Sequence, residues 1–167
     1  MKKIIKELYP YVIIVVVVVL IRTFIITPVR VDGESMSSTL DNGNILLLNK
    51  LDKKYKRFDI VVLNKGNSKL IKRVIGLPGD YVEYKDNDLY INGELIDDPY
   101  TTRTNDFTLE ELYNIDRIPK GYYFVMGDNR LHSLDSRSYE VGLVSEERIK
   151  GTVCIRLFPF SKFGKVQ

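Results

Sequence analysis

The sequence contains no alanine, and it has only one cysteine and one histidine in 167 residues. With Cys154 as the sole cysteine, no disulfide can form within the chain, and its place in the strand-like stretch TVCIRLF predicts a small packed side chain. With His132 as the sole histidine, a zinc site built from several His or Cys ligands is unsupported. The Gly-rich patterns of nucleotide-binding proteins are also missing. We therefore expect no metal and no organic cofactor.

Clusters of like charge are absent as well. The net charge is +3, and the lysines are scattered along the chain. Proteins that bind nucleic acid gather Lys and Arg on one face, so we expect no nucleic-acid partner. A hydrophobic fraction of 44% with 28% charged residues is the composition of a globular protein rather than a disordered one.

The N-terminus begins with the basic stretch MKKIIK and continues, after Glu7, with an uncharged apolar run from Leu8 to Ile21. As a helix this run measures roughly 21 Å, or roughly 28 Å when it continues past Arg22, against a ~30 Å hydrocarbon core. Arg22, near one end, can extend its charge to the interface. A cleaved secretory signal would need an Ala-x-Ala-like site, which this chain lacks. An uncleaved membrane anchor is favoured.

This interpretation divides the chain into three parts. Because the lysines precede the apolar run, the positive-inside rule predicts a cytoplasmic N-terminus and an extracytoplasmic body. We expect a single-pass protein of the cell membrane, in contact with the lipid bilayer. The expected parts are a cytoplasmic basic segment (1–7), a transmembrane anchor (8–27) and an extracytoplasmic domain (28–167).

Beyond Pro28 the sequence predicts a mostly β domain, either a barrel or a sandwich. Short apolar or alternating runs are separated by turns, and Asn92-Gly93 is a strong hairpin signal. The exception is a polar stretch at about 97–120, which we interpret as a small insertion. It contains FTLEELYNI, a short helix for which Thr108 is the expected cap. The expected strands include ILLLNK, RFDIVVL, KLIKRVIGL, GYYFVMGDN and GTVCIRLF.

The stretch GESMSSTL, from Gly33 to Leu40, places three serines and a threonine just beyond the anchor. It is either an ordinary surface turn or the carrier of a nucleophilic hydroxyl. A Ser-His-Asp triad would have to use His132, and a lone histidine in a polar loop is more often a solvated bystander. Lysine also activates serine when burial lowers its pKa from ~10.4. Lys72 alternates with apolar residues in KLIKRVIGL, although an edge lysine that reaches water would give the same pattern.

A second polar stretch, GDNRLHSLDSR (residues 127–137), holds two aspartates, two arginines, an asparagine and two serines. A charged surface loop is the usual explanation of such a run. If these groups are buried instead, they must satisfy one another's hydrogen bonds. The density of the run and its position after an apolar strand suggest a braced shell around a site.

Together the three stretches resemble the type I signal peptidases, in their short Gram-positive-like form. SMSSTL resembles the family's nucleophile box, Ser-Met-x-Pro-Thr-Leu, and KRVIGLPGD resembles its lysine box. GDNRLHSLDSR resembles its third box, Gly-Asp-Asn-x-x-x-Ser-x-Asp-Ser-Arg, at every fixed position. The terminal RLFPFSKFG and the leading anchor match as well, and the resemblance is weakest at 97–120. It implies a signal-peptidase-like β-barrel or sandwich behind one transmembrane helix.

The resemblance implies a Ser-Lys endopeptidase that removes signal peptides from exported preproteins. Ser35 would be the nucleophile, and its backbone N–H would stabilise the oxyanion. Lys72 would be the general base and would later protonate the leaving amine. Ser133 would orient the Lys72 amine by a hydrogen bond.

The acidic and basic residues of the third box would have supporting roles. Asp135 and Arg137 would pair to hold the loop in shape, with Asp128 also supporting it. The chain departs from the family pattern at Ser38, where Pro is frequent, so the turn is expected to be less rigid. At Gly33 some members carry a serine that donates to the oxyanion, so here the backbone would have to supply the donors.

Substrate and membrane contacts follow from the same resemblance. An extended substrate would add as a strand at a sheet edge, with alternate side chains entering shallow apolar pockets. The residues implied to line these pockets are Val29, Val31, Leu40 and Ile71. Of these, Val29 and Val31 share a strand face close to Ser35. The residues that would contact either the lipid interface or the protein core are Met36, Phe158, Phe160 and Phe163.

Two other functions remain open at this point. A self-cleaving repressor-type Ser-Lys protease shares the fold, but the anchor and the lack of a DNA-binding segment argue against it. A membrane-anchored binding module with a degenerate site is favoured only by Ser38.

Overall fold

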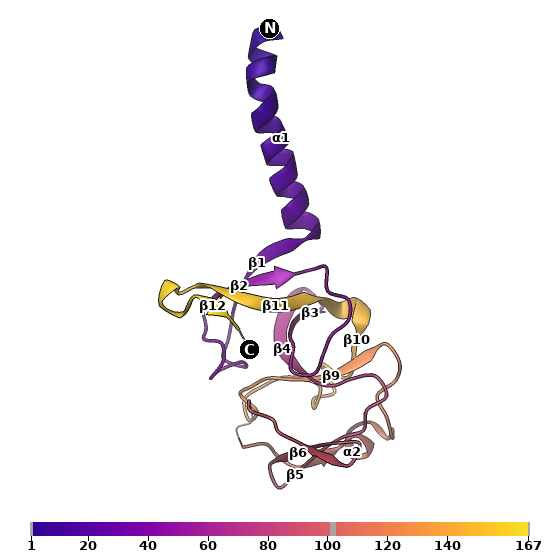
Figure 1. Cartoon of the computed structure of the whole chain (residues 1–167). Helices are drawn as coiled ribbons and strands as arrows, with labels where there is room; N and C mark the ends of the chain where they lie inside the picture. Colours follow the sequence, from indigo (N-terminus) through magenta and orange to yellow (C-terminus); the bar gives the residue numbers. More distant parts are fainter. Residues whose placement is uncertain (1, 101–102, 167) are drawn as a thin grey trace.

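One long helix stands away from a β-rich body in the computed structural model, which describes residues 2–100 and 103–166 (Figure 1). The helix, α1, spans Lys2–Phe24. Its segment Glu7–Phe24 has a mean hydropathy of 2.0, is not buried against the body, and is long and apolar enough to cross a membrane. Most of the expected basic segment 1–7 is helical, because α1 begins at Lys2, and the division into a cytoplasmic segment and a membrane anchor stays a prediction.

The helix ends before residue 27, where we had placed the end of the anchor. The Lys50 ammonium donates to the carbonyls of Arg22 and Thr23 (both 3.0 Å), and the Lys50 N–H donates to Ile25 O (2.9 Å). These bonds satisfy carbonyls that a further helical turn would otherwise have used. The chain then enters a strand at Ile26, so residues 26–27 belong to the body.

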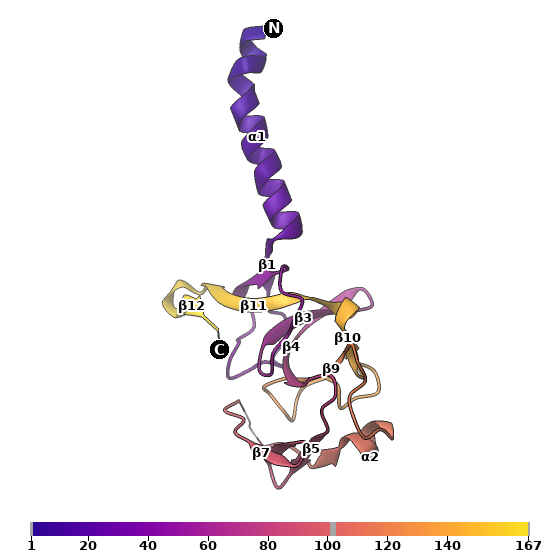
Figure 2. The ribbon, with the colours of Figure 1, turned by 45° about the vertical axis from the view of Figure 1, so that its right-hand side comes forward.

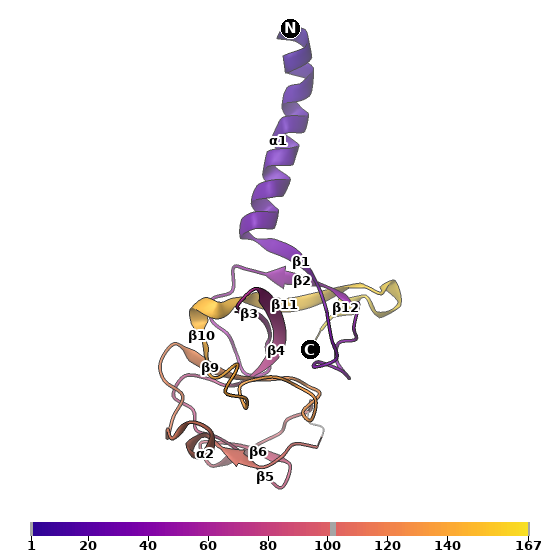
Figure 3. The ribbon, with the colours of Figure 1, turned by 180° about the vertical axis from the view of Figure 1, so that it is seen from behind.

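The body is built on an eight-stranded antiparallel sheet in the order β1-β2-β11-β3-β4-β9-β10, with β12 paired to β11. Seen from behind, β1, β2 and β11 lie at the foot of α1 (Figure 3). The expected strands are confirmed, and the mostly β prediction with them. Their bounds are β1 Ile26–Arg30, β2 Ile45–Asn49, β3 Ile60–Lys65, β4 Ser68–Gly76, β9 Tyr122–Met126, β10 Val144–Ser145, β11 Ile149–Phe158 and β12 Gly164–Lys165, with 3-10 turns at Glu146–Arg148 and Phe160–Lys162.

A second antiparallel sheet, ordered β7-β6-β5-β8, lies at the end of the body farthest from α1 (Figure 2). It includes part of the stretch that we interpreted as an insertion. We call residues 82–118 the second lobe, because β8 pairs with β5 and the polar stretch is continuous with this sheet. Residues 101–102 of that stretch lie outside the described residues. The bounds are β5 Val82–Lys85, β6 Asp88–Ile91, β7 Glu94–Ile96, β8 Phe107–Thr108 and α2 Leu109–Tyr113.

Local sequence signals account for the turns of the second lobe. Asn92 and Gly93 both have positive φ (54° and 83°), as a two-residue hairpin turn requires. The Thr108 hydroxyl accepts from Glu111 N, and the Glu111 side chain accepts from Thr108 N, which forms a capping box at the start of α2. Both predictions are confirmed.

Apolar side chains fill the space between the two sheets. One buried cluster joins Ile75, Phe124 and Met126 of the large sheet to side chains of the second lobe such as Tyr84 and Phe107. Because the two sheets share this core, a displacement of the second lobe would shift the side chains at the ends of β4 and β9.

The prediction that Cys154 is packed is wrong, because its side chain is exposed. Val153 is buried, and successive residues of a strand point to opposite faces. The pairing of β11 with β2 also shifts register between Val153 and Ile155, which leaves Cys154 opposite no partner on β2.

The turn that carries the hydroxyl-rich stretch is strained at Ser38. Thr39 N donates to Met36 O (3.0 Å) and closes the turn, and Ser38 within it has φ = 52°. Non-glycine residues rarely adopt this left-handed region. Proline fixes φ near −65° and cannot adopt it. The departure from the family pattern at Ser38 therefore changes the backbone conformation and not only its rigidity.

We expect Ser38→Pro to lower the free energy of unfolding by more than about 1 kcal/mol, because the ring is incompatible with the native φ. Ser38→Gly is the matched control and should be at least as stable as the parent, since glycine tolerates positive φ. Thermal unfolding of the full chain in detergent measures both. A Ser38→Pro protein as stable as the parent would show that the turn is not left-handed at this position.

Candidate active site

The structure brings together two residues that the sequence analysis singled out. Lys72 lies on β4, between β3 and β9, and its Nζ is 2.6 Å from Ser35 Oγ. The same amine donates to Ile71 O (3.0 Å). Ser35 lies in the turn that follows β1, and Leu40 N donates to Met36 O (2.7 Å) to keep this turn compact. A hydroxyl and an amine at this distance can exchange a proton.

The Lys72 amine is almost completely removed from water. The residue is 1% exposed, so the alternative of an edge lysine that reaches solvent is wrong. Burial lowers the pKa of Lys72 to about 8, although the nearby carboxylates of Asp135 and Asp128 act to raise it and Arg137 acts to lower it. With a pKa of about 8, roughly one amine in ten is neutral at pH 7, against under one in a thousand for a free lysine.

The charged side chains of the third-box loop, residues 127–137, form a largely buried hydrogen-bonded network, while Leu131 and Leu134 of the loop are exposed. Asp135 is fully buried, and its carboxylate accepts from Arg137 Nη2 (2.8 Å) and Nε (2.9 Å). It also accepts from Gly127 N (3.0 Å), which fixes the start of the loop. The expected Asp135–Arg137 contact is thus present in the structure. His132, in the same loop, is exposed.

Ser133 does not make the hydrogen bond to Lys72 that we expected. Its Oγ is buried and has no hydrogen-bond partner among the described residues, while the Lys72 amine bonds to Ser35 and to Ile71 O instead. Ser133 nevertheless packs against the nucleophile turn through Gly127. A Cβ added at Gly127 would lie 2.2 Å from Ser133 Oγ and 2.3 Å from Ser35 O, so only glycine fits there.

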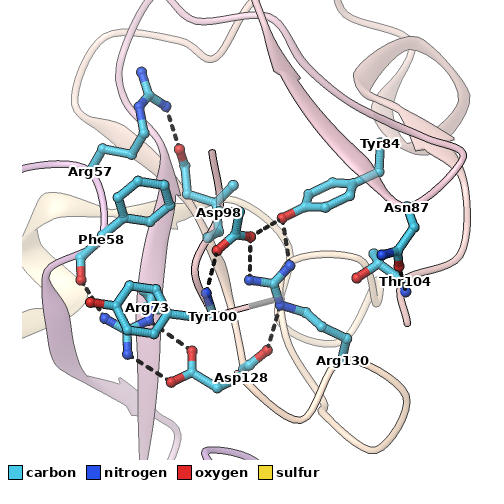
Figure 4. Close-up of polar contacts among 12 residues, drawn as sticks. Arg57, Phe58, Arg73, Tyr84, Asn87, Asp98, Tyr100, Thr104, Asp128 and Arg130 are labelled. Carbon is cyan, nitrogen blue, oxygen red and sulfur yellow. Dashed lines mark hydrogen bonds and ion pairs between the residues drawn. The ribbon is translucent and has the colours of Figure 1, made fainter. Parts of the chain in front are cut away.

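Sequence reasoning missed the partner of Asp128. Arg73, the residue after Lys72, donates to the Asp128 carboxylate through Nε (2.8 Å) and Nη2 (2.7 Å), and both side chains are fully buried. The available signal was an arginine inside an apolar strand, since a buried guanidinium needs a carboxylate. The Tyr100 ring lies over this guanidinium, 3.3 Å from its carbon (Figure 4).

A second buried ion pair was also missed. Arg130 of the third-box loop pairs with Asp98 of the second lobe (2.6 Å), and both contact the Tyr84 hydroxyl (Figure 4). Asp98 and Tyr84 come from a part of the chain that the motif pattern does not cover, so only the fold could reveal them.

The four residues implied to line substrate pockets lie in one apolar cluster, together with Met36. Leu40 is 0% and Val31 3% exposed, while Val29 is only partly buried. The cluster includes Met36 and Leu40 from the turn of Ser35, and Ile71, the neighbour of Lys72 on β4. Its role in substrate binding stays a prediction.

The aromatic residues near the C-terminus are exposed. Phe158, Phe160 and Phe163 are 45%, 83% and 64% exposed, whereas Met36 is 1% exposed. Met36 therefore packs in the core, and the idea that it contacts lipid is wrong. Phe158 and Phe160 contact each other edge to face, with ring centroids 5.8 Å apart.

An oxyanion could be bound at the backbone of the nucleophile turn. Among the hydrogen bonds of the described residues, none uses the Ser35 N–H as donor. Gly33, two residues earlier, has φ = 100° and no side chain to contribute. The arrangement therefore offers a nucleophile, a desolvated base and a backbone donor, which are the components of acyl transfer.

Comparison with known proteins agrees with this chemistry. Residues 3–158 match the family model described as signal peptidase, peptidase S26. Signal peptidase I of Bacillus caldolyticus is 42% identical over 170 residues, covering 93% of this chain and 92% of that protein. Signal peptidase I T of Bacillus subtilis is 44% identical, covering 93% and 86%.

A solved structure extends the comparison to the fold. The crystal structure of a signal peptidase I from Enterococcus faecalis is 39% identical, with a TM-score of 0.54. The match covers 59% of this chain and 96% of that one. A family match over most of the length, with relatives about 40% identical, shows that the chain belongs to the signal peptidase family, peptidase S26.

Proposed function

We propose that this hydrolase is a membrane-anchored serine endopeptidase that cleaves N-terminal signal peptides from exported preproteins with a Ser35–Lys72 dyad. The observation that carries the proposal is the 2.6 Å contact between a serine hydroxyl and a lysine amine that burial makes a usable base at neutral pH. The names of the family relatives supply the substrate class.

The chemistry runs through one proton carrier. Neutral Lys72 takes the Ser35 hydroxyl proton while Oγ bonds to the scissile carbonyl carbon, and the Ser35 N–H donates to the developing oxyanion. The lysine then returns the proton to the leaving amine as the C–N bond breaks. A water molecule, deprotonated by the same amine, hydrolyses the resulting acyl-enzyme and regenerates Ser35.

The third-box loop holds Ser35 and Lys72 in position relative to each other. Asp135 and Arg137 hold the start of the loop through Gly127, and Asp128 neutralises the buried Arg73 beside the base. Ser133 Oγ is buried with no hydrogen-bond partner in residues 2–100 and 103–166, and it is the group we assign to orient the lysine amine when the substrate enters.

Substrate binding uses the free edge of the large sheet. β1 is an edge strand, paired on one side with β2 only, and the nucleophile turn begins just after it. An extended peptide adding beside β1 would point alternate side chains at Val29, Ile71 and the floor formed by Val31 and Leu40. A shallow floor accepts small side chains at the first and third positions before the cut.

The anchor places this site at the membrane. With a cytoplasmic N-terminus and an extracytoplasmic body, the nucleophile turn follows α1 by about ten residues, where a substrate's own signal helix would end. Phe158, Phe160 and Phe163 are exposed aromatic residues suited to the lipid interface. The partners proposed are thus preprotein signal peptides and the bilayer, with no nucleic acid.

We expect the full chain in detergent to cleave a preprotein with alanine at the first and third positions before its junction. Ser35→Ala should lower the rate at least about 10⁴-fold, since it removes the attacking atom. Ser37→Ala, in the same turn, is the matched control and should cleave like the parent. Analysis of the products by gel and mass spectrometry reports the junction. Cleavage there by the Ser35→Ala protein would falsify the assigned nucleophile.

The dependence of kcat/KM on pH should follow the Lys72 amine. Only the neutral amine is a base, so activity should rise with pH through an apparent pKa of about 8 and be lost as the pH falls below it. Lys72→Ala should lose activity, while Lys69→Ala, at an exposed position of the same strand, should keep the parent profile. An acid limb that disappears in His132→Asn would identify histidine as the base and contradict the proposal.

A further inference from the structure

Asp98 joins the second lobe to the third-box loop. It follows β7, and its Oδ2 accepts from Arg130 Nη2 (2.6 Å) and from the Tyr84 hydroxyl (Figure 4). Arg130 Nη1 donates to the Tyr84 oxygen, so the three groups close a ring of hydrogen bonds. Burial raises the pKa of Tyr84, with Arg130 opposing, which keeps the phenol protonated as a donor. The Arg130 and Asp98 side chains are only 0% and 3% exposed.

Arg130 carries this contact into the loop. Its Nε donates to Gly127 O (3.1 Å), and its own carbonyl accepts from Arg137 Nη2 (2.6 Å). The N–H of Gly127 is held by Asp135. Both polar groups of the Gly127 backbone are therefore fixed, one of them by a guanidinium anchored in the second lobe.

The loop in turn holds the nucleophile. Gly127 lies so close to Ser35 O that no Cβ fits between them. Asn129, next to Arg130, donates from its backbone N to Ser35 O (3.1 Å) and from its side chain to Glu34 O (3.2 Å). If Arg130 moved, Gly127 and Asn129 would move with it, and Ser35 would be displaced.

Residues 98–100 also contact Arg73, the residue that follows Lys72 on β4. Tyr100 N donates to Asp98 Oδ1 (3.1 Å), and the Tyr100 ring covers the guanidinium of Arg73. Arg73 adjoins Lys72 in sequence and pairs with Asp128 of the loop. The short stretch 98–100 thus contacts both Arg130 of the third-box loop and Arg73, the neighbour of Lys72.

We propose that Asp98 and Tyr84 are positioning residues, which act through Arg130 to hold Ser35 in place against Lys72. Neither touches the reacting atoms. The inference rests on the proposed Ser-Lys function. Replacing a buried ion pair by apolar residues of the same volume is often neutral or stabilising, so we assign the Arg130–Asp98 pair to positioning rather than to stability.

The test compares Tyr84→Phe and Asp98→Asn with the parent in the full detergent-solubilised chain. Both should lower kcat by about 10- to 100-fold with KM within about twofold, since a misplaced nucleophile loses the aligned attack but not the binding cluster. A looser loop would also admit water to the amine, and the acid limb of the pH profile should move to higher pH. Ile91→Val, in the core of the second lobe, is the control: it should lower Tm without changing kcat or the limb.

The outcomes separate this inference from the proposed function. If the parent cleaves and Ser35→Ala does not, but Tyr84→Phe and Asp98→Asn keep the parent kcat and limb, the positioning role is overturned and the dyad stands. If Ile91→Val reproduces their effects well below its Tm, the role is structural only and the inference is likewise overturned. If the parent does not cleave the preprotein, both the proposed function and the positioning role are overturned. Tyr84→Phe, which leaves the ion pair in place, decides the matter if Asp98→Asn fails to fold.

Discussion

The removal of the Lys72 amine from water is the constraint on which the rest of the site depends. A lysine in solvent is protonated at neutral pH and cannot accept a proton, so its contact with Ser35 would be chemically inert. Burial on a central strand lowers its pKa to about 8 and makes the amine a base. The eight-stranded sheet causes this burial, because β4 lies between β3 and β9 and residues 71–76 of β4 are buried.

The other charged residues buried near the Lys72 amine are held in ion pairs. Arg73, Asp128, Asp135 and Arg130 are all buried within reach of the dyad, and each has an oppositely charged partner. Burial is the largest cause of the lowered Lys72 pKa, the carboxylates of Asp135 and Asp128 act to raise that pKa, and Arg137 acts to lower it. The charges of the loop of residues 127–137 are all paired: Asp135 with Arg137 inside the loop, Asp128 with Arg73 of β4, and Arg130 with Asp98 of the second lobe.

The sequence predicted the parts of the fold and site that depend on local patterns. Apolar alternation placed the strands, Asn92-Gly93 and Thr108 fixed a hairpin and a helix cap, and Lys72 was recognised as a lysine among apolar residues. The contacts of Asp98 and Tyr84 were out of reach, since they depend on the second lobe folding back onto the loop. The side of β11 on which Cys154 lies and the left-handed φ of Ser38 depend on how the strands and turns pack, which a residue pattern does not contain.

The central claim is tested most directly by the protonation state of the lysine itself. Lysines of the full chain would be labelled with ¹³C at Cε, and the Cε resonance of each would be followed from pH 6 to 11 by NMR in detergent, with Lys72→Arg used to assign the signal. The account predicts that the Lys72 signal titrates near pH 8, apart from the signals of the other lysines. A Lys72 signal that titrates with the exposed lysines would contradict it, because the amine would then be charged at neutral pH and unable to act as the base.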